Sequence, residues 1–258
     1  MDENGEPMAR ISARPQIAVA KNYEELCSQA AQKILALSKK RIREGGRFTL
    51  ALSGGSTPEG IYSLMASRAY RKRFAWEKIH FFFGDERWVP RNSPRSNYKM
   101  IARALLTKVP VPRANIHAIR TNTPNAAASA VLYEKELIEF FQLKPGEFPC
   151  FDLILLGLGQ DGHTASLFPK DPALLEKKRL AVPVAATGIA EKRVTLTLAA
   201  INHAKAVFFV ASGREKALAL KAVLSPTMTR PALPAQLVRP LHGGSWWFVD
   251  HDAAHTII

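Results

Sequence analysis

The stretch that decides the fold runs from Phe151 to Pro169 and reads FDLILLGLGQDGHTASLFP. Its first part is a short apolar run that ends at a glycine, and this pattern predicts a strand buried on both faces. Gly159 and Gly162 then open a turn in which backbone can approach a ligand, and Asp161 and His163 lie within that turn. Ligands of open α/β sheets bind just outside the carboxyl ends of the strands, so this turn is a candidate reaction centre.

Outside this stretch, apolar runs alternate with amphipathic segments along the chain. The expected strands cover residues 17–20, 47–53, 79–83, 116–118, 194–198, 206–210 and 245–250. The expected helices cover about 22–43, a segment from Pro58, a segment from 96–98, 126–141, and 214–224. The segment 170–184 is expected to be irregular with a short helix at most, and 194–198 to be a half-exposed strand. Alternating strands and helices predict an α/β fold, with a doubly wound, mostly parallel sheet flanked by helices.

Composition limits the class of protein. The 258 residues are 47% hydrophobic, which is enough apolar material for a full core. No apolar run approaches the ~20 residues that a membrane-spanning helix needs. The N-terminal segment has no apolar centre of the kind found in secretory signals. Cys27 and Cys150 lack CxxC spacing and neighbouring histidines, so we expect a cytoplasmic protein without a disulfide framework, in which Cys27 is a buried small hydrophobe.

The chain carries 36 Lys and Arg against 22 Asp and Glu, a formal net charge of +14 that favours anionic partners. The basic runs at 39–43, 71–73 and 177–179 are dispersed, and the helix dipole favours cations at helix C-termini. Because a nucleic-acid-binding protein concentrates its charge with exposed aromatics, we expect no nucleic-acid partner. With no repeat or long linker, the sequence predicts one domain over 17–258 after a disordered tail, 1–16.

A glycine loop, SGGSTPEG, follows the expected strand at 47–53. Gly54 and Gly55 remove side chains from the turn, while Ser56 or Thr57 is placed to cap the next helix. Free backbone N–H groups at a helix N-terminus favour a phosphate or carboxylate. The loop lacks the GK[ST] ending of a Walker loop and the GxGxxG spacing of a dinucleotide fold, so it predicts an anion site of another kind.

Two further strands end in charged residues. Gly84 is followed by Asp85, Glu86 and Arg87, where the guanidinium suits a phosphate or a carbonyl and the carboxylates suit sugar hydroxyls or the arginine. Which of the two carboxylates touches a ligand stays open. Arg214 and Lys216 occupy the expected first turn of another helix, where the dipole disfavours cations unless an anion is bound.

Four segments together resemble the 6-phosphogluconolactonases, relatives of the glucosamine-6-phosphate deaminases. They are GLGQDGHTASLFP, LALSGGSTPEGIY, FFFGDERWVP and VASGREKALALKAVL, which match in the expected order over roughly residues 17 to 250. The resemblance implies the modified Rossmann fold of that superfamily and hydrolysis of 6-phosphogluconolactone. For this reaction we expect His163 to be the general base, with Asp161 and Arg87 assisting. The expected substrate-binding residues are Gly54, Gly55, Ser56, Thr57, Asp85, Glu86, Gly159, Arg214 and Lys216, among which the resemblance itself implies the glycine-loop residues and Lys216 as contacts of the sugar phosphate.

Hydrolysis of an already activated lactone requires no metal or organic cofactor, so none is expected, and we expect a monomer or weak homodimer. Two alternatives remain. In the related deaminases, a glutamate follows the histidine by five residues, whereas this chain has Phe168, which cannot transfer protons. A sugar-phosphate sensor is the other alternative, but the first ~16 residues are too short for a helix-turn-helix.

Overall fold

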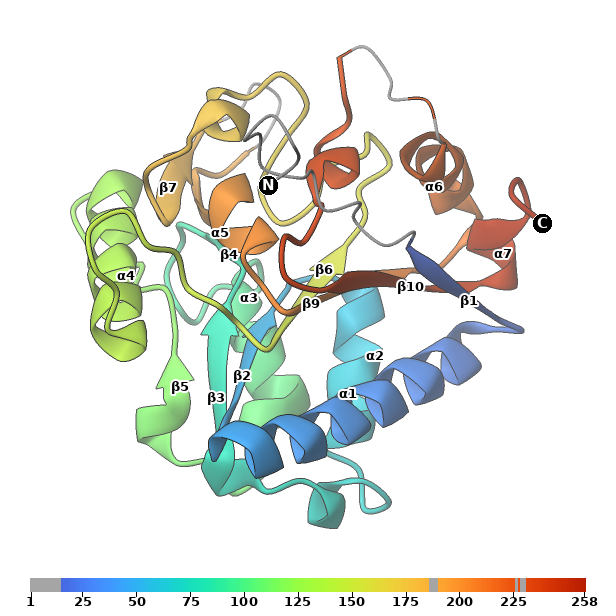
Figure 1. Cartoon of the computed structure of the whole chain (residues 1–258), viewed down its shortest axis with the longest axis horizontal. Helices are drawn as coiled ribbons and strands as arrows, with labels where there is room; N and C mark the ends of the chain where they lie inside the picture. The colour runs from blue at the N-terminus through green and yellow to red at the C-terminus, as the bar shows by residue number, and fades with distance from the viewer. Residues whose placement is uncertain (1–14, 186–189, 226, 228–230) are drawn as a thin grey trace, which may run out of the picture.

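A central sheet organises the computed structural model, which describes residues 15–185, 190–225, 227 and 231–258. Its strands are β1 (Gln16–Ala20), β2 (Phe48–Leu52), β3 (Ile79–Phe83), β5 (Ile116–His117), β6 (Leu153–Gly157), β9 (Ala206–Ala211) and β10 (Gly244–Asp250). The order is β1-β10-β9-β6-β2-β3-β5, and every neighbouring pair is parallel. The predicted α/β fold with a doubly wound, mostly parallel sheet is therefore confirmed (Figure 1).

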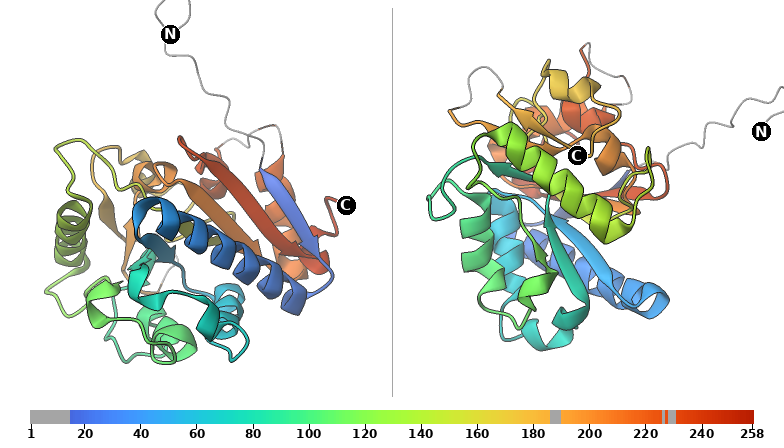
Figure 2. Two further views of the ribbon diagram at one scale, coloured as in Figure 1. Left: turned by 60° about the horizontal axis from the view of Figure 1, so that its bottom comes forward. Right: turned by 90° about the vertical axis from the view of Figure 1, so that its left-hand side faces the viewer.

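Helices cover both faces of this sheet. They are α1 (Tyr23–Gly45), α2 (Ser56–Met65), α3 (Asn97–Ile101), α4 (Ala126–Phe141), α5 (Leu198–Asn202), α6 (Ala217–Leu224) and α7 (His251–Ala254). Figure 1 shows α1 and α2 on one side of the sheet and α5 and α6 on the other. In Figure 2, α1 runs across the strands at the β10 end. The predicted helix over 126–141 and the predicted strand over 79–83 have the bounds that the structure gives them.

Local signals set the ends of α1 as the sequence predicts. The side chain of Asn22 accepts a hydrogen bond from the backbone N–H of Glu25 at 2.9 Å, and Gly46 ends the helix with φ of +75°. The Glu25 carboxylate accepts from the backbone N–H of Lys21, one residue before the cap. Cys27 is buried, as expected, and its sulfur lies beside Gly60 of α2.

The apolar runs that predict strands lie at the centre of the core. All five residues of β2 and all six of β9 are buried, and β6 is buried up to its terminal glycine. Because these strands are covered on both faces, their apolar side chains pack in the core on either side of the sheet. Polar groups lie where the strands end.

A second, antiparallel sheet of three strands was not predicted. It consists of β4 (Asp85–Arg87), β8 (Arg193–Leu196) and β7 (Ala181–Val184), in the order β4-β8-β7, and α4 lies beside it (Figure 2). The expectation of an irregular 170–184 is wrong, because 181–184 is a strand. The expectation of a half-exposed strand at 194–198 is also wrong, because Val194, Thr195 and Leu196 are buried between β4 and β7.

The ends of the chain and its two cysteines complete the description. Residues 1–14 of the predicted tail lie outside the described residues, while Gln16, also assigned to that tail, is the first residue of β1. Within the described part, no helix has the length and apolar character to cross a bilayer. Cys27 and Cys150 are both free thiols.

Candidate active site

The four predicted loops meet at one edge of the sheet. They follow β9, β6, β2 and β3, which are neighbours in the sheet and parallel, so their carboxyl ends lie side by side. A cavity of about 190 Å³ opens there. Of the residues predicted for the site, its lining includes Gly54, Gly55, Ser56, Thr57, Asp85, Arg87, Gly159, His163 and Lys216. Glu86, Asp161 and Arg214 are not among its lining residues.

The loop after β2 presents backbone to the cavity. A Cβ on Gly54 would lie 2.0 Å from Oδ1 of Asn97, and Gly55 has φ of +109°, so glycine is required at both positions. The N-cap of α2 is Gly55, and no side chain caps it. The predicted capping by Ser56 or Thr57 is therefore wrong, and the first N–H groups of α2 remain available to an anion.

The two carboxylates of β4 do different things. Asp85, 4% exposed, lines the cavity and accepts hydrogen bonds from the Ser166 hydroxyl at 2.6 Å and the Asn97 amide at 3.3 Å. Glu86, 1% exposed, turns away and accepts from the backbone N–H groups of Asn97 and Tyr98, both at 2.7 Å. Glu86 therefore anchors the first turn of α3, which corrects its predicted place in the substrate site.

The environment of Glu86 is unfavourable for a charge. Burial raises its pKa above the ordinary value, while the backbone N–H groups of Tyr98, Asn97 and Arg87 act in the opposite direction. The Ser96 hydroxyl also donates to this carboxylate at 3.2 Å. These donors explain how an almost fully buried acid is accommodated beside Asp85.

Two arginines face each other across the small sheet. Arg87 on β4 and Arg193 on β8 are register partners, and both line the cavity. Burial lowers the pKa of Arg193, with Asp85 raising it and Arg87 lowering it. Like charges directly opposite each other destabilise a sheet, so this pair is favourable only with negative charge nearby. Asp85 supplies part of that charge, and an anionic ligand would supply more.

Unsatisfied polar atoms also concentrate here. Within the described residues, six buried side-chain nitrogen or oxygen atoms have no hydrogen-bond partner, and four of them belong to residues that line this cavity. These four atoms are Oγ of Ser53, Nε of Arg87, Oδ1 of Asn97 and Nε of Arg193. Because buried unpaired polar groups are costly, their clustering indicates a site built for a polar, anionic ligand.

The turn after β6 carries an imidazole paired with a carboxylate. Nδ1 of His163 lies 2.5 Å from Oδ1 of Asp161, which also accepts the backbone N–H of His163 at 3.1 Å. Burial acts to raise the pKa of Asp161, but the hydrogen bonds and charge of His163 outweigh it and lower the pKa. An ionised Asp161 holds the proton on Nδ1, so the lone pair of Nε2 is free to accept a proton.

Close packing fixes this pair. A Cβ on Gly159 would lie 2.1 Å from Nδ1 of His163, so only glycine allows the ring to lie against the turn. The ring of Phe168, 8% exposed, packs against His163 with centroids 4.6 Å apart, and the Arg193 guanidinium lies 5.5 Å from the same phenyl ring. Phe168 therefore contacts both the imidazole and the buried arginine. Ala165 has φ of +48°, a strained value for a residue with a Cβ.

The loop after β9 delivers one of its two cations. Gly213, with φ of +96°, donates its N–H to the Asp250 carboxylate at 3.1 Å, and a short 3₁₀ turn, Arg214–Lys216, precedes α6. Lys216 lines the cavity and Arg214 does not. His163 and Lys216 thus border the same space.

Sequence reasoning missed several lining residues. Arg193 was not predicted because its strand pairs with β4 across more than a hundred residues of chain. Residues 96–98 were expected to start a helix and were not named as site residues, although Asn97 lines the cavity. The sequence signal that could have identified Arg193 was a cation placed directly before an alternating strand. No cluster of three or more His, Cys, Asp or Glu suited to a metal ion occurs among the residues that the structure describes.

Comparison with known proteins gives consistent matches over nearly the whole chain. Residues 21–247 match the family model of glucosamine-6-phosphate isomerases/6-phosphogluconolactonase. The chain is 41% identical over 243 residues to a 6-phosphogluconolactonase of Synechocystis sp., covering 94% of this chain and 98% of that protein. It is 38% identical over 244 residues to the 6-phosphogluconolactonase of Homo sapiens, covering 93% of each.

A solved structure agrees in three dimensions. The 6-phosphogluconolactonase from Trypanosoma cruzi superposes with a TM-score of 0.84 at 31% identity, covering 96% of this chain and 98% of that one. On the matching family model, the sequence identity and the shared fold, this chain belongs to the 6-phosphogluconolactonase family, within the glucosamine-6-phosphate isomerase/6-phosphogluconolactonase superfamily.

Proposed function

We propose that this chain hydrolyses the 1,5-lactone of 6-phosphogluconate to 6-phosphogluconate, with His163 as the general base that activates water. One observation carries the proposal: an imidazole oriented by Asp161 borders the same small cavity as Arg87, Arg193 and Lys216. A phosphorylated lactone needs both parts, an anion site for its phosphate and a base near its carbonyl. Family membership supports the same reaction.

The proposed reaction begins at Nε2 of His163. As Nε2 takes a proton from water, the oxygen of that water forms a bond to the lactone carbonyl carbon, and the carbonyl oxygen becomes an oxyanion. Backbone N–H groups of the turn between Gly157 and Gly162, together with Arg87, are proposed to stabilise this charge. When the bond from the carbonyl carbon to the ring oxygen breaks, the imidazolium returns its proton to that oxygen. The product acid then ionises.

The phosphate is proposed to lie among the cations at the other part of the cavity. Lys216 and Arg193 supply charge, and the uncapped N-terminus of α2 supplies backbone N–H groups. The unpaired Nε of Arg193 supports this assignment, because a buried guanidinium gains most from a bidentate oxyanion. Asp85 is proposed to hold Asn97 and Ser166 in place and to face the sugar hydroxyls.

Phe168 argues against amino-sugar phosphate deamination. The acid that the deaminases place five residues after the histidine is replaced by a phenyl ring that packs on His163. No proton-transferring group therefore occupies that position.

The free thiols of Cys27 and Cys150 suit the reducing cytoplasm, which is the proposed location of this protein. We also propose a monomer or weak homodimer, which sedimentation equilibrium would test.

The test supplies fresh 6-phosphogluconolactone in a coupled assay and subtracts spontaneous hydrolysis. We expect clear lactonase turnover, reduced by about a hundredfold to ten-thousandfold in His163→Ala, the usual contribution of a general base. His255→Ala is the matched control, since this exposed imidazole near the C-terminus should leave turnover unchanged. Wild-type turnover in His163→Ala would refute the proposed base. Binding of 6-phosphogluconate without any turnover by the wild-type chain would favour a sensor.

A further inference from the structure

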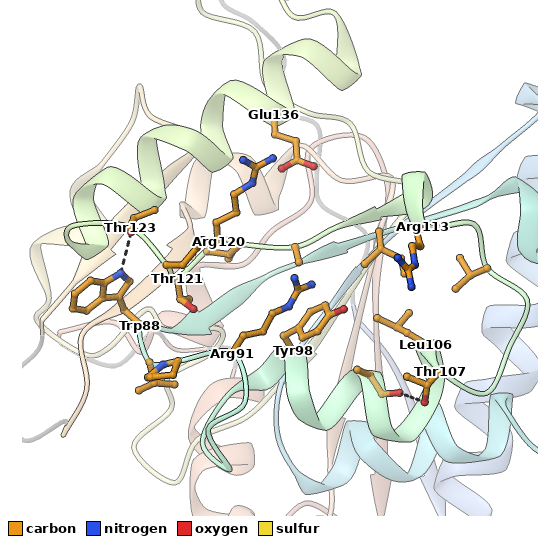
Figure 3. A pocket seen from close by; sticks show the side chains of 18 residues that line it. Trp88, Arg91, Tyr98, Leu106, Thr107, Arg113, Arg120, Thr121, Thr123 and Glu136 are labelled. Carbon is orange, nitrogen blue, oxygen red and sulfur yellow. Dashed lines mark hydrogen bonds between the residues drawn. The ribbon is translucent and has the colours of Figure 1, made fainter.

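A second cavity, of about 1160 Å³, shares α3 with the first. Asn97 lines the smaller cavity and the next residue, Tyr98, lines the larger one. The larger cavity lies between the segment after β4, the helical segment that begins at α3, and the chain around β5 (Figure 3). No step of the proposed lactonase reaction uses it.

Three guanidiniums from separate segments border this cavity. Arg91 follows β4, Arg113 begins the 3₁₀ turn Arg113–Asn115, and Arg120 follows β5 (Figure 3). None of them has an acidic partner within salt-bridge distance in the described part of the chain, whereas Arg95 and Arg103 elsewhere on the surface are paired. Three unneutralised cations around one space repel one another, and an anion placed among them would remove that repulsion.

One of these guanidiniums is held in place by an aromatic ring. The Arg91 guanidinium lies 3.4 Å from the centroid of the Tyr98 ring, a cation–π contact that orients the planar group (Figure 3). A guanidinium stacked in this way keeps its edge N–H groups free for an oxyanion and offers a flat surface to a planar ring. Arg91 therefore has the preorganisation of a binding residue.

The lining carries more positive than negative charge. Glu136 on α4 is the only carboxylate among the lining residues, and its Oε1 lies 3.0 Å from Nδ1 of His117. One carboxylate offsets only part of the charge of three guanidiniums. The charge of the cavity is positive, and the natural ligand chemistry is anionic.

The floor of the cavity is apolar. Leu106 and Ile119 are 7% and 4% exposed, and the half-buried Val111 and Ile116 lie beside them in the lining. Leu106 and Ala102, which also lines the cavity, are the two ends of a π-helical turn, a rare conformation that is frequent at functional sites. A ligand that fits needs several negative charges and a sizeable apolar or planar part, because inorganic phosphate alone would leave the floor uncovered.

We propose that this cavity is a second ligand site that binds a nucleotide, with its phosphates at the central Arg91, flanked by Arg113 on one side and Arg120 on the other, and its base against the apolar floor beside Tyr98 (Figure 3). A nucleoside diphosphate combines the multiple charges and the planar ring that the lining calls for. The volume of the cavity, about 1160 Å³, is somewhat above the usual range of small-molecule sites, so a whole nucleotide has room.

The test is calorimetric titration of ADP into the full chain, with saturating 6-phosphogluconate to fill the smaller cavity. We expect one ADP bound per chain, and about tenfold weaker binding in each of Arg113→Ala and Arg120→Ala, which remove charged hydrogen bonds. Arg43→Ala removes an exposed cation outside both cavities and should leave ADP affinity within about twofold. Adenosine alone and phosphate alone should each bind more weakly than ADP.

Four outcomes would overturn the proposal. The first is that the wild-type chain does not bind ADP up to about 1 mM, and the second is that the Arg113→Ala/Arg120→Ala double variant binds ADP as well as the wild type does. The third is that 6-phosphogluconate displaces ADP. The fourth is that an acidic peptide binds where ADP does not. Lactonase turnover measured on the same variants should equal that of the wild type, so failure here is separate from failure of the proposed lactonase activity.

Discussion

Of the two cavities beside α3, the smaller one has the features expected of a catalytic site. The larger one, about 1160 Å³, is bordered by exposed guanidiniums and an apolar floor. The smaller one, about 190 Å³, holds four buried polar atoms without partners and an oriented imidazole. Buried unpaired polar atoms lower the stability of the folded state, whereas exposed arginines change it little. The smaller cavity is therefore the better candidate for the catalytic site.

The same contrast appears in how the cations are held. Arg193 is packed against Phe168, bonded weakly to Ser166 at 3.5 Å and placed in register with Arg87. Within the described residues, Arg113 and Arg120 are exposed and have no acidic partner within salt-bridge distance, and exposed side chains change rotamer on the picosecond to nanosecond timescale. Chemistry needs fixed groups, and reversible binding tolerates mobile ones.

Among the changes that compare the two cavities, substitution of Arg193 has the largest expected effect. Arg193→Ala should lower kcat/KM for 6-phosphogluconolactone by about a hundredfold or more, because it would remove the proposed charged hydrogen bonds to the phosphate in a buried setting. Arg193→Lys should recover only part, since an ammonium cannot form the bidentate fork. Steady-state kinetics measure both.

Arg113→Ala is the matched control at the larger cavity. It removes the same charge but should leave kcat/KM within about twofold, because an exposed cation outside the site acts only through screened long-range attraction. Equal losses in Arg193→Ala and Arg113→Ala would show that net charge, rather than the buried guanidinium, governs binding of the lactone.

The sequence predicts the part of the site that is local along the chain. The glycine turn around His163, the loop at Gly54 and Gly55, and Lys216 all follow apolar runs, so parallel strands bring them to one edge. Arg193 escaped prediction because the alternation Val194, Thr195, Leu196 is typical of a strand with one exposed face, while β4, the neighbour that brings this strand to the cavity, lies more than a hundred residues away in sequence.

The other errors have similar causes. The expected irregular segment 170–184 includes strand 181–184, which contains Pro183 but lies at the edge of the small sheet, where a missing N–H is tolerated. Glu86 was grouped with Asp85 because they are adjacent, yet a strand points neighbouring side chains to opposite faces. Only the fold reveals that Glu86 reaches the first turn of α3.

The second prediction compares two carboxylates, one beside each cavity. Glu86→Ala should lower the free energy of unfolding by about 2 to 3 kcal/mol, because it leaves the buried N–H groups at the start of α3 without partners. Glu136→Ala, which loses one half-buried bond to His117, should cost about 1 kcal/mol. Urea unfolding followed by circular dichroism measures both, and a larger loss in Glu136→Ala would contradict the assigned role of Glu86.

The smallest expected effect concerns His80 and His117, the histidine pair next to Glu136. Burial, followed by the charges of His117 and Arg47, lowers the pKa of His80 from 6.5 to about 4, and its Nδ1 lies 3.2 Å from Nε2 of His117. As the pH falls from 6.5 toward 4, the unfolded chain takes up this proton before the folded chain does, so the folded state loses stability over that window.

His80→Gln removes this titration while keeping a polar side chain next to His117. Between about pH 7 and about pH 4, the wild type should lose about 1 kcal/mol more of its unfolding free energy than His80→Gln does, a value discounted for the partial solvent exposure of the ring. Urea unfolding at a series of pH values gives the difference. Parallel curves for the two proteins would mean that His80 ionises as easily in the folded chain as in the unfolded one, and would contradict the lowered pKa of this histidine.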